Sequence, residues 1–162
     1  MSDESFETIY RRYFDAVYRF ALSLTQDAQR AEEICQETFF KALGSLDRFR
    51  GDSSIRTWLF SIARNSYLSE QRKRPSIPLE EILEQPDESA GPEEQALRRD
   101  QARRLHQRLH QLPEPYKEVF SLRVFAQLSF RQIGELFGKT ENWACVVYHR
   151  ARAKLTDKEE LS

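Results

Sequence analysis

The sequence predicts an all-α protein made of two small helical domains joined by a flexible acidic linker. Only five of the 162 residues are glycine, and apolar residues recur at helical spacing through most of the chain. The stretch 75–92 interrupts this pattern with four prolines, five acidic residues and no lysine or arginine, a composition typical of a linker. We therefore expect a first domain at 1–74 and a second at 93–162.

Three helices are predicted in the first domain. The first is expected at about 4–24, and Asp27 can cap a second at about 28–45. A loop at 47–54 precedes a third helix, which begins near Ile55 and ends at the basic run before Pro75. The inward faces of the first two helices should include Tyr10, Phe14, Val17, Ile34, Cys35 and Leu43.

The second domain should open with a helix from about residue 93 that Pro113 closes. The next helix should have Pro115 in its first turn, where proline is well tolerated. The apolar residues of the opening helix are Ala96, Leu97, Leu105, Leu109 and Leu112.

Two further short helices have the form of a helix-turn-helix. Ser129 and Gln132 match a capping box, and Gly138 should end the helix that they open. Thr140 can cap a final helix that extends to about Leu155. The second helix of such a pair reads the major groove with its exposed side chains, which here are Asn142, Cys145, Val146, His149 and Arg150. A solvated surface helix is the alternative interpretation.

Two surfaces of the first domain are also candidate sites. Aromatic and basic residues alternate from Phe49 to Arg74, a mixture suited to single-stranded DNA because bases stack on rings while arginines follow the backbone. Trp58 would serve equally well as a core residue. Glu33, Gln36 and Glu37 form a polar face on the second helix, which is either simply solvated or a docking surface for a basic partner.

Nothing in the sequence indicates catalytic residues, a cofactor or a metal site. Glycine-rich phosphate loops and nucleophile elbows are missing, and His106 and His110 lack a third ligand, which favours a surface pair. No apolar run is long enough to span a membrane, so we expect a cytoplasmic protein without direct membrane insertion. The net charge of −1 predicts weak non-specific DNA binding, which indicates that a partner contributes affinity.

Three segments stand out in this order along the chain: Ala31-Glu-Glu-Ile-Cys-Gln-Glu-Thr-Phe39, Phe49-Arg-Gly-Asp-Ser-Ser-Ile-Arg-Thr-Trp-Leu-Phe-Ser-Ile-Ala-Arg-Asn65, and the region from Leu112-Pro113 to His149-Arg-Ala-Arg152. Together they resemble the extracytoplasmic-function (ECF) group of the sigma-70 family of bacterial RNA polymerase sigma factors. The resemblance implies a sigma-2 domain at 1–74, a sigma-4 domain at 93–162, and a non-catalytic role in promoter-specific transcription initiation.

The resemblance also implies partners and residue roles. Core polymerase would bind through the clamp helices of its largest subunit and through its flap, with Glu33, Gln36 and Glu37 at the clamp contact. The minus-10 element of promoter DNA would be melted and read by Arg50, Thr57, Trp58, Arg64 and Asn65. The minus-35 element would meet Arg131, Asn142, Cys145, Val146, His149 and Arg150. An anti-sigma factor, often membrane-bound in this group, is a further expected partner.

Two other functions remain open at this point. A stand-alone helix-turn-helix repressor would use the same last helix but would normally dimerise on a two-fold site. A decoy that occupies polymerase without opening promoters fits the recognition helix, because Cys145 stands where the family usually has a basic residue. Apolar contact with thymine methyl groups is one way in which such a helix still reads DNA.

Overall fold

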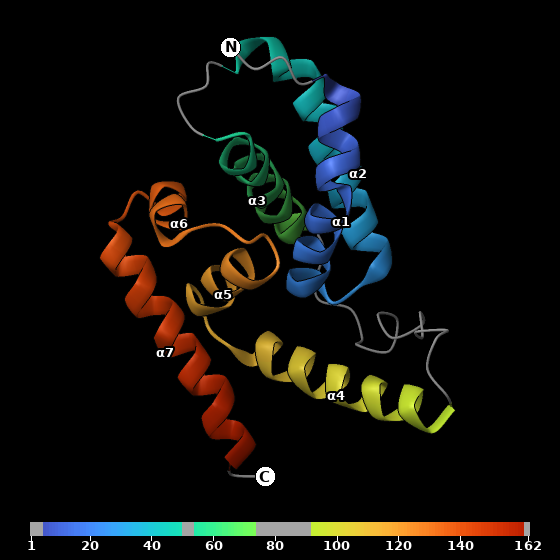
Figure 1. The fold of residues 1–162 in the computed structure, drawn as a ribbon, viewed down its shortest axis with the longest axis vertical. Coiled ribbons are helices and arrows are strands. Elements are labelled where there is room, and N and C mark those ends of the chain that lie inside the picture. Colours follow the sequence, from blue (N-terminus) through green and yellow to red (C-terminus); the bar gives the residue numbers. More distant parts are fainter. Residues whose placement is uncertain (1–4, 50–53, 74–91, 161–162) are drawn as a thin grey trace.

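The computed structural model describes residues 5–49, 54–73 and 92–160, and in these ranges the chain forms helices and no strands. The predicted all-α class is therefore confirmed. Figure 1 shows α1, α2 and α3 as a bundle, with α5 beside it, α6 and α7 to one side and α4 extending away below. The predicted linker lies almost wholly outside the described residues.

The N-terminal domain matches the predicted helices within one or two residues. Ser5 caps its first helix by accepting a hydrogen bond from the Thr8 N–H at 3.2 Å, and Asp27 caps the second by accepting from the Arg30 N–H at 2.9 Å. The elements are α1 (Phe6–Thr25), α2 (Ala28–Ser45), the short 3-10 helix η1 (Leu46–Arg48) and α3 (Ile55–Lys73).

The C-terminal domain contains four helices, as predicted, with two shifts in their ends. Pro115 is the N-cap of α5 rather than a first-turn residue, and the last helix continues past Leu155 to Glu160. The elements are α4 (Pro92–Gln111), α5 (Tyr116–Val124), α6 (Phe130–Phe137) and α7 (Glu141–Glu160).

Some apolar residues of the helices are exposed. Of those named for the opening helix of the second domain, Leu109 and Leu112 are buried, whereas Leu97 is 56% exposed and Leu105 39%. The prediction of an inward face was wrong for Tyr10 and Leu43, which are 41% and 58% exposed. Cys35 is fully buried, which confirms its assignment as a small core residue.

The main apolar core continues from one domain into the other. Val17, Phe20 and Phe60 of the first domain belong to the same buried cluster as Val119 and Leu122 of α5. A smaller cluster joins the end of α4 to α5 and α7. The domains thus pack on each other in this structure, with α5 and α6 against α1 and α3 (Figure 1).

Candidate nucleic-acid interface

The α6–turn–α7 unit has the capping and close packing of a helix-turn-helix. The Ser129 hydroxyl accepts from the Gln132 N–H and the Gln132 side chain accepts from the Ser129 N–H, which confirms the predicted capping box. Gly138 ends α6 at a φ of +67°, and Thr140 caps α7 by accepting from the Trp143 N–H at 3.0 Å. One helix therefore ends and the next begins within a few residues.

Gly134, in the middle of α6, is a residue that sequence reasoning missed. A Cβ atom at Gly134 would lie 2.7 Å from the carbonyl oxygen of Thr140 and 2.8 Å from that of Lys139. Both atoms belong to backbone and cannot move aside cheaply, so only glycine allows this approach of turn to helix. Its signal in the sequence was a glycine in the middle of a short helix.

The predicted recognition residues lie along one face of α7. Asn142, Val146, His149 and Arg150 are exposed, Cys145 is half-exposed, and their spacing of three or four residues places them in one row. Arg131, in the first turn of α6, is also exposed and lies 3.7 Å from the Glu135 carboxylate. The structure therefore brings the five predicted side chains of α7 to one face of that helix, with Arg131 exposed on α6.

Aromatic rings support this row from below. The His149 ring lies 5.3 Å from the Tyr148 ring and 6.2 Å from the Phe130 ring, and Tyr148 stacks on Phe120 at 5.9 Å. Arg123 lies over the Phe130 ring at 4.3 Å. These contacts restrict the orientations open to His149.

The residues expected at single-stranded DNA occupy different environments on α3. Thr57 is buried, and its hydroxyl hydrogen-bonds with that of Ser54 at 2.9 Å, so it fixes the start of the helix. Trp58 is half-buried and its ring lies 5.0 Å from that of Phe49. Asn65 is exposed, Arg64 lies against the C-terminal domain, and Arg50 falls outside the described residues.

The polar face of α2 lies on the outer surface of the bundle. Gln36 and Glu37 are exposed, and Glu33, one turn before Glu37, is half-buried. Two apolar residues that sequence reasoning did not assign to this face adjoin it, since Phe40 is 70% exposed and Leu43 58%. The available signal was the pair Phe39-Phe40, because neighbouring helix residues point in directions about 100° apart, and Phe39 is the one on the buried side.

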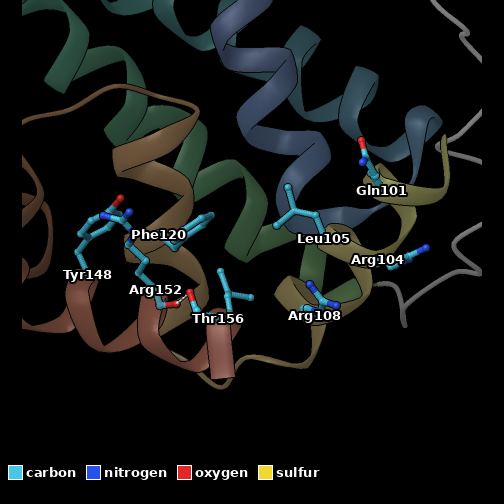
Figure 2. Close-up of a pocket in the computed structure, with 9 residues that line it drawn as sticks. Gln101, Arg104, Leu105, Arg108, Phe120, Tyr148, Arg152 and Thr156 are labelled. Carbon is cyan, nitrogen blue, oxygen red and sulfur yellow. Dashed lines mark hydrogen bonds between the residues drawn. The ribbon is translucent and has the colours of Figure 1, made fainter. Parts of the chain in front are cut away.

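A groove of about 660 Å³ separates α4 from α7. Figure 2 shows Leu105 and Phe120 facing this space, with Tyr148 and Arg152 of α7 along its opposite wall. Arg104 and Arg108 add positive charge from α4. The groove therefore combines an apolar floor with a basic rim, the composition of a helix-binding site.

The pKa values of Cys35 and Glu114 are both raised above their ordinary values. Burial raises the pKa of the Cys35 thiol to about 12, so this cysteine is unreactive at neutral pH. Burial, reinforced by the nearby Glu118 carboxylate, raises the pKa of Glu114 to about 7. Within the described parts of the chain, no cluster of acidic, histidine or cysteine residues has the make-up of a metal site.

Two helical domains, the second a helix-turn-helix with a polar recognition row, define a DNA-binding protein of the all-α class. Family models agree with this division: residues 9–76 match Sigma-70 region 2 and residues 102–155 match Sigma-70, region 4. The chain belongs to the sigma-70 family, in its ECF group, and is a promoter-specific transcription initiation factor. This confirms the family expected from the sequence.

Individual relatives support the same assignment. The chain is 32% identical over 156 residues to the RNA polymerase sigma factor YlaC of Bacillus subtilis, covering 94% of this chain and 90% of the relative. It is 33% identical over 148 residues to the ECF RNA polymerase sigma-E factor of Haemophilus influenzae, covering 82% and 76%. In fold it resembles the sigma factor RpoE of Bartonella quintana, solved in complex with the anti-sigma factor NepR, with a TM-score of 0.75, 22% identity and coverage of 97% and 98%.

None of the helices in the described part of the chain is long and apolar enough to cross a membrane.

Proposed function

We propose that this sigma factor docks on the clamp helices of the largest polymerase subunit through α2. The observation that carries this role is the exposure of Gln36 and Glu37 beside the apolar side chains of Phe40 and Leu43. An aromatic centre with a polar border is the usual composition of a protein interface. Glu33 completes the acidic edge that would meet basic residues of the clamp.

The start and middle of α3 would engage the minus-10 element. Trp58 and Phe49 offer neighbouring rings for unstacked bases, and Asn65 is exposed for contact with an extruded base. Arg64, with Arg50, would follow the strand backbone. Thr57, buried under the start of α3, would act by holding the preceding loop in place.

The recognition row of α7 would lie in the major groove at the minus-35 element. Asn142, His149 and Arg150 supply polar groups for base edges, while Val146 and Cys145 offer apolar contact with thymine methyl groups. Arg131 would reach a phosphate from the start of α6.

The basic groove between α4 and α7 would receive a helix of the polymerase flap. Its floor of Leu105, Phe120 and Leu155 suits an apolar helix face, and its arginines suit acidic residues beside that face. Clamp and flap would then hold the two ends of the sigma factor at separate points of the polymerase.

The proposal also covers the domain division, the place of action and a further partner of this sigma factor. Residues 1–74 and 93–162 would act as separate domains on the polymerase, joined by 75–92, and the protein would work in the cytoplasm as a non-catalytic specificity subunit. We also propose an anti-sigma factor as a partner. The supporting observation is the fold shared with a sigma factor that was solved with one.

Run-off transcription tests the docking role directly. Core polymerase with this chain should give discrete transcripts from promoter fragments of its own genome, and a variant with Glu33, Gln36 and Glu37 changed to alanine should give far fewer. The matched control changes three exposed polar residues of α4, Glu93, Glu94 and Gln107, to alanine. Equal loss in both variants would contradict the docking face. Specific duplex binding without new transcripts would favour the repressor.

A further inference from the structure

A chain of aromatic rings connects the buried core of the C-terminal domain to His149 on the recognition row. Phe120, which is 8% exposed, stacks on Tyr148 with an angle of 11° between the ring planes. The Tyr148 ring lies 5.5 Å from that of Phe130, and the Phe130 ring lies 6.2 Å from that of His149. The His149 ring therefore adjoins rings from two helices, Tyr148 of its own α7 and Phe130 of α6.

Arg123, in the last turn of α5, contacts the Phe130 ring from a third helix. Its guanidinium lies 4.3 Å from the centre of that ring, within the range of a cation–π interaction. The same guanidinium donates to the Leu128 carbonyl at 3.1 Å, and the Leu128 N–H donates to the Leu122 carbonyl at 3.1 Å. Arg123 therefore holds both the Phe130 ring and the backbone that leads into α6.

The orientation of the His149 ring matters because this side chain is exposed. An exposed side chain samples several rotamers and loses that freedom when it meets a base. Ring contacts that already favour one orientation reduce this loss, and they also restrict which base edge the side chain can reach. A nitrogen of the imidazole ring can then donate or accept a hydrogen bond at a defined point of the major groove.

We propose that Phe130 is a positioning residue for minus-35 recognition: its ring, held by Arg123, orients the His149 imidazole and so sets the preference at the base pair that His149 meets. The inference rests on the proposed role of α7 at the minus-35 element. Phe130 acts through His149, whereas Asn142 and Arg150 meet their own base pairs without its help.

NMR signals of the His149 ring test the contact with Phe130 in the absence of DNA and polymerase. The chain contains three histidines, so a His149→Ala sample identifies the imidazole signals of His149. We expect Phe130→Leu to move these signals toward their positions in an unfolded chain, because a neighbouring aromatic ring is lost. Phe130→Tyr, which keeps the ring, should leave them nearly unchanged. Unchanged signals in Phe130→Leu would overturn the inference.

Base preference along the minus-35 element tests whether Phe130 acts through His149. Each base pair of the element is changed in turn, and run-off transcription by core polymerase with each sigma variant gives the preference at each position. His149→Ala should abolish the preference at one position. Phe130→Leu should lower the preference at that same position roughly two- to tenfold, the range for ordering one side chain. The double variant should be no worse than His149→Ala alone, because the two residues act as one unit.

The same change at another aromatic residue separates positioning from folding. Phe125→Leu alters a half-buried ring at the end of α5, so it should lower the melting temperature while leaving base preference unchanged. Equal weakening at every position by Phe130→Leu, or a further loss in the double variant, would assign Phe130 a structural role and overturn the inference. If Phe130→Leu fails to fold, Arg123→Gln provides the decision, because it removes the cation over the ring and should lower the preference at the His149 position.

Arg150→Ala, measured on the same promoters, distinguishes failure of this inference from failure of the proposed function. If Arg150→Ala changes base preference while His149→Ala and Phe130→Leu do not, the role of α7 at the minus-35 element stands and the positioning role of Phe130 is wrong. If none of the three variants changes preference at any position, the proposed role of α7 fails and the inference fails with it.

Discussion

Arg30 and Glu70 meet fork to fork between α2 and α3, with the Arg30 Nε 2.6 Å from one Glu70 carboxylate oxygen and its Nη2 2.9 Å from the other. The Arg30 side chain is 1% exposed and also donates to the Gln71 side chain at 3.1 Å. A buried guanidinium requires such partners because an unpaired charge in the interior is very costly. The pair therefore fixes the end of α3 against α2.

Removing one partner of the Arg30–Glu70 pair should destabilise the protein more than replacing both. Glu70→Ala leaves Arg30 buried without its carboxylate, so we expect the free energy of unfolding to fall by about 3 kcal/mol. Arg30→Met with Glu70→Leu should cost less than the single change. Urea unfolding followed by circular dichroism measures both, and an equal loss in the two variants would show that packing rather than charge pairing dominates.

Gly134 should tolerate no side chain. Gly134→Ala places a Cβ atom within 2.8 Å of two backbone carbonyl oxygens, so the turn must shift. We expect a loss of about 1–3 kcal/mol, the range for overpacked sites, together with weaker minus-35 binding.

Gly138→Ala is the matched comparison for Gly134→Ala. Gly138 has open space around it but a φ of +67°, so its replacement should cost only about 1 kcal/mol through backbone strain. Thermal melting compares the two, and a larger loss at Gly138 would contradict the steric argument for Gly134.

The pH dependence of stability should contain a contribution from Glu114. Burial and the Glu118 carboxylate raise its pKa from 4.5 to about 7, while Lys117 acts in the opposite direction. A raised pKa means that the folded chain binds this proton more tightly than the unfolded chain. The stabilisation is therefore complete below about pH 4.5 and is lost as the pH rises through about 7.

Glu114→Gln should remove this part of the pH dependence. His110 has a pKa lowered by burial, so its contribution runs the other way and is lost as the pH falls. The quantity to measure is therefore the difference in urea midpoint between the unchanged chain and Glu114→Gln at several pH values. The Glu114 side chain as a whole is exposed to solvent, so screening weakens the effect. A difference in urea midpoint that does not vary with pH would refute the predicted contribution of Glu114 to the pH dependence of stability.

Base recognition at minus-35 should depend on Arg150 more than on arginines elsewhere. If Arg150 contacts a base edge, Arg150→Ala should cost about 1–3 kcal/mol of binding and relax sequence preference at one position. Promoter variants assayed by run-off transcription measure this preference. Arg103→Ala, an exposed change on α4, should leave it unaltered, and a uniform loss over all promoters would instead assign Arg150 to a phosphate.

Local features of the fold were predictable from the sequence because local chemistry determines them. The caps at Asp27, Ser129 and Thr140 each depend on a side chain and an N–H group a few residues away. By contrast, the exposure of Leu97 depends on where α4 ends relative to other helices, which periodicity does not contain. The pairing of Arg64 with Glu118 joins residues 54 positions apart, so no local pattern could predict it.

Phe40 should contribute to polymerase binding without contributing to folding. Its side chain is 70% exposed and lies one turn from Gln36 and Glu37 on α2, so truncation removes no core contact. Aromatic residues at the centre of an interface often account for about 2 kcal/mol each, roughly 30-fold in Kd. Titration of core polymerase with Phe40→Ala should show a loss of that order at unchanged melting temperature. Val124→Ala, which changes an apolar residue of α5 that is 40% exposed, should bind normally; an unchanged Kd for Phe40→Ala would confine the docking face to its polar residues.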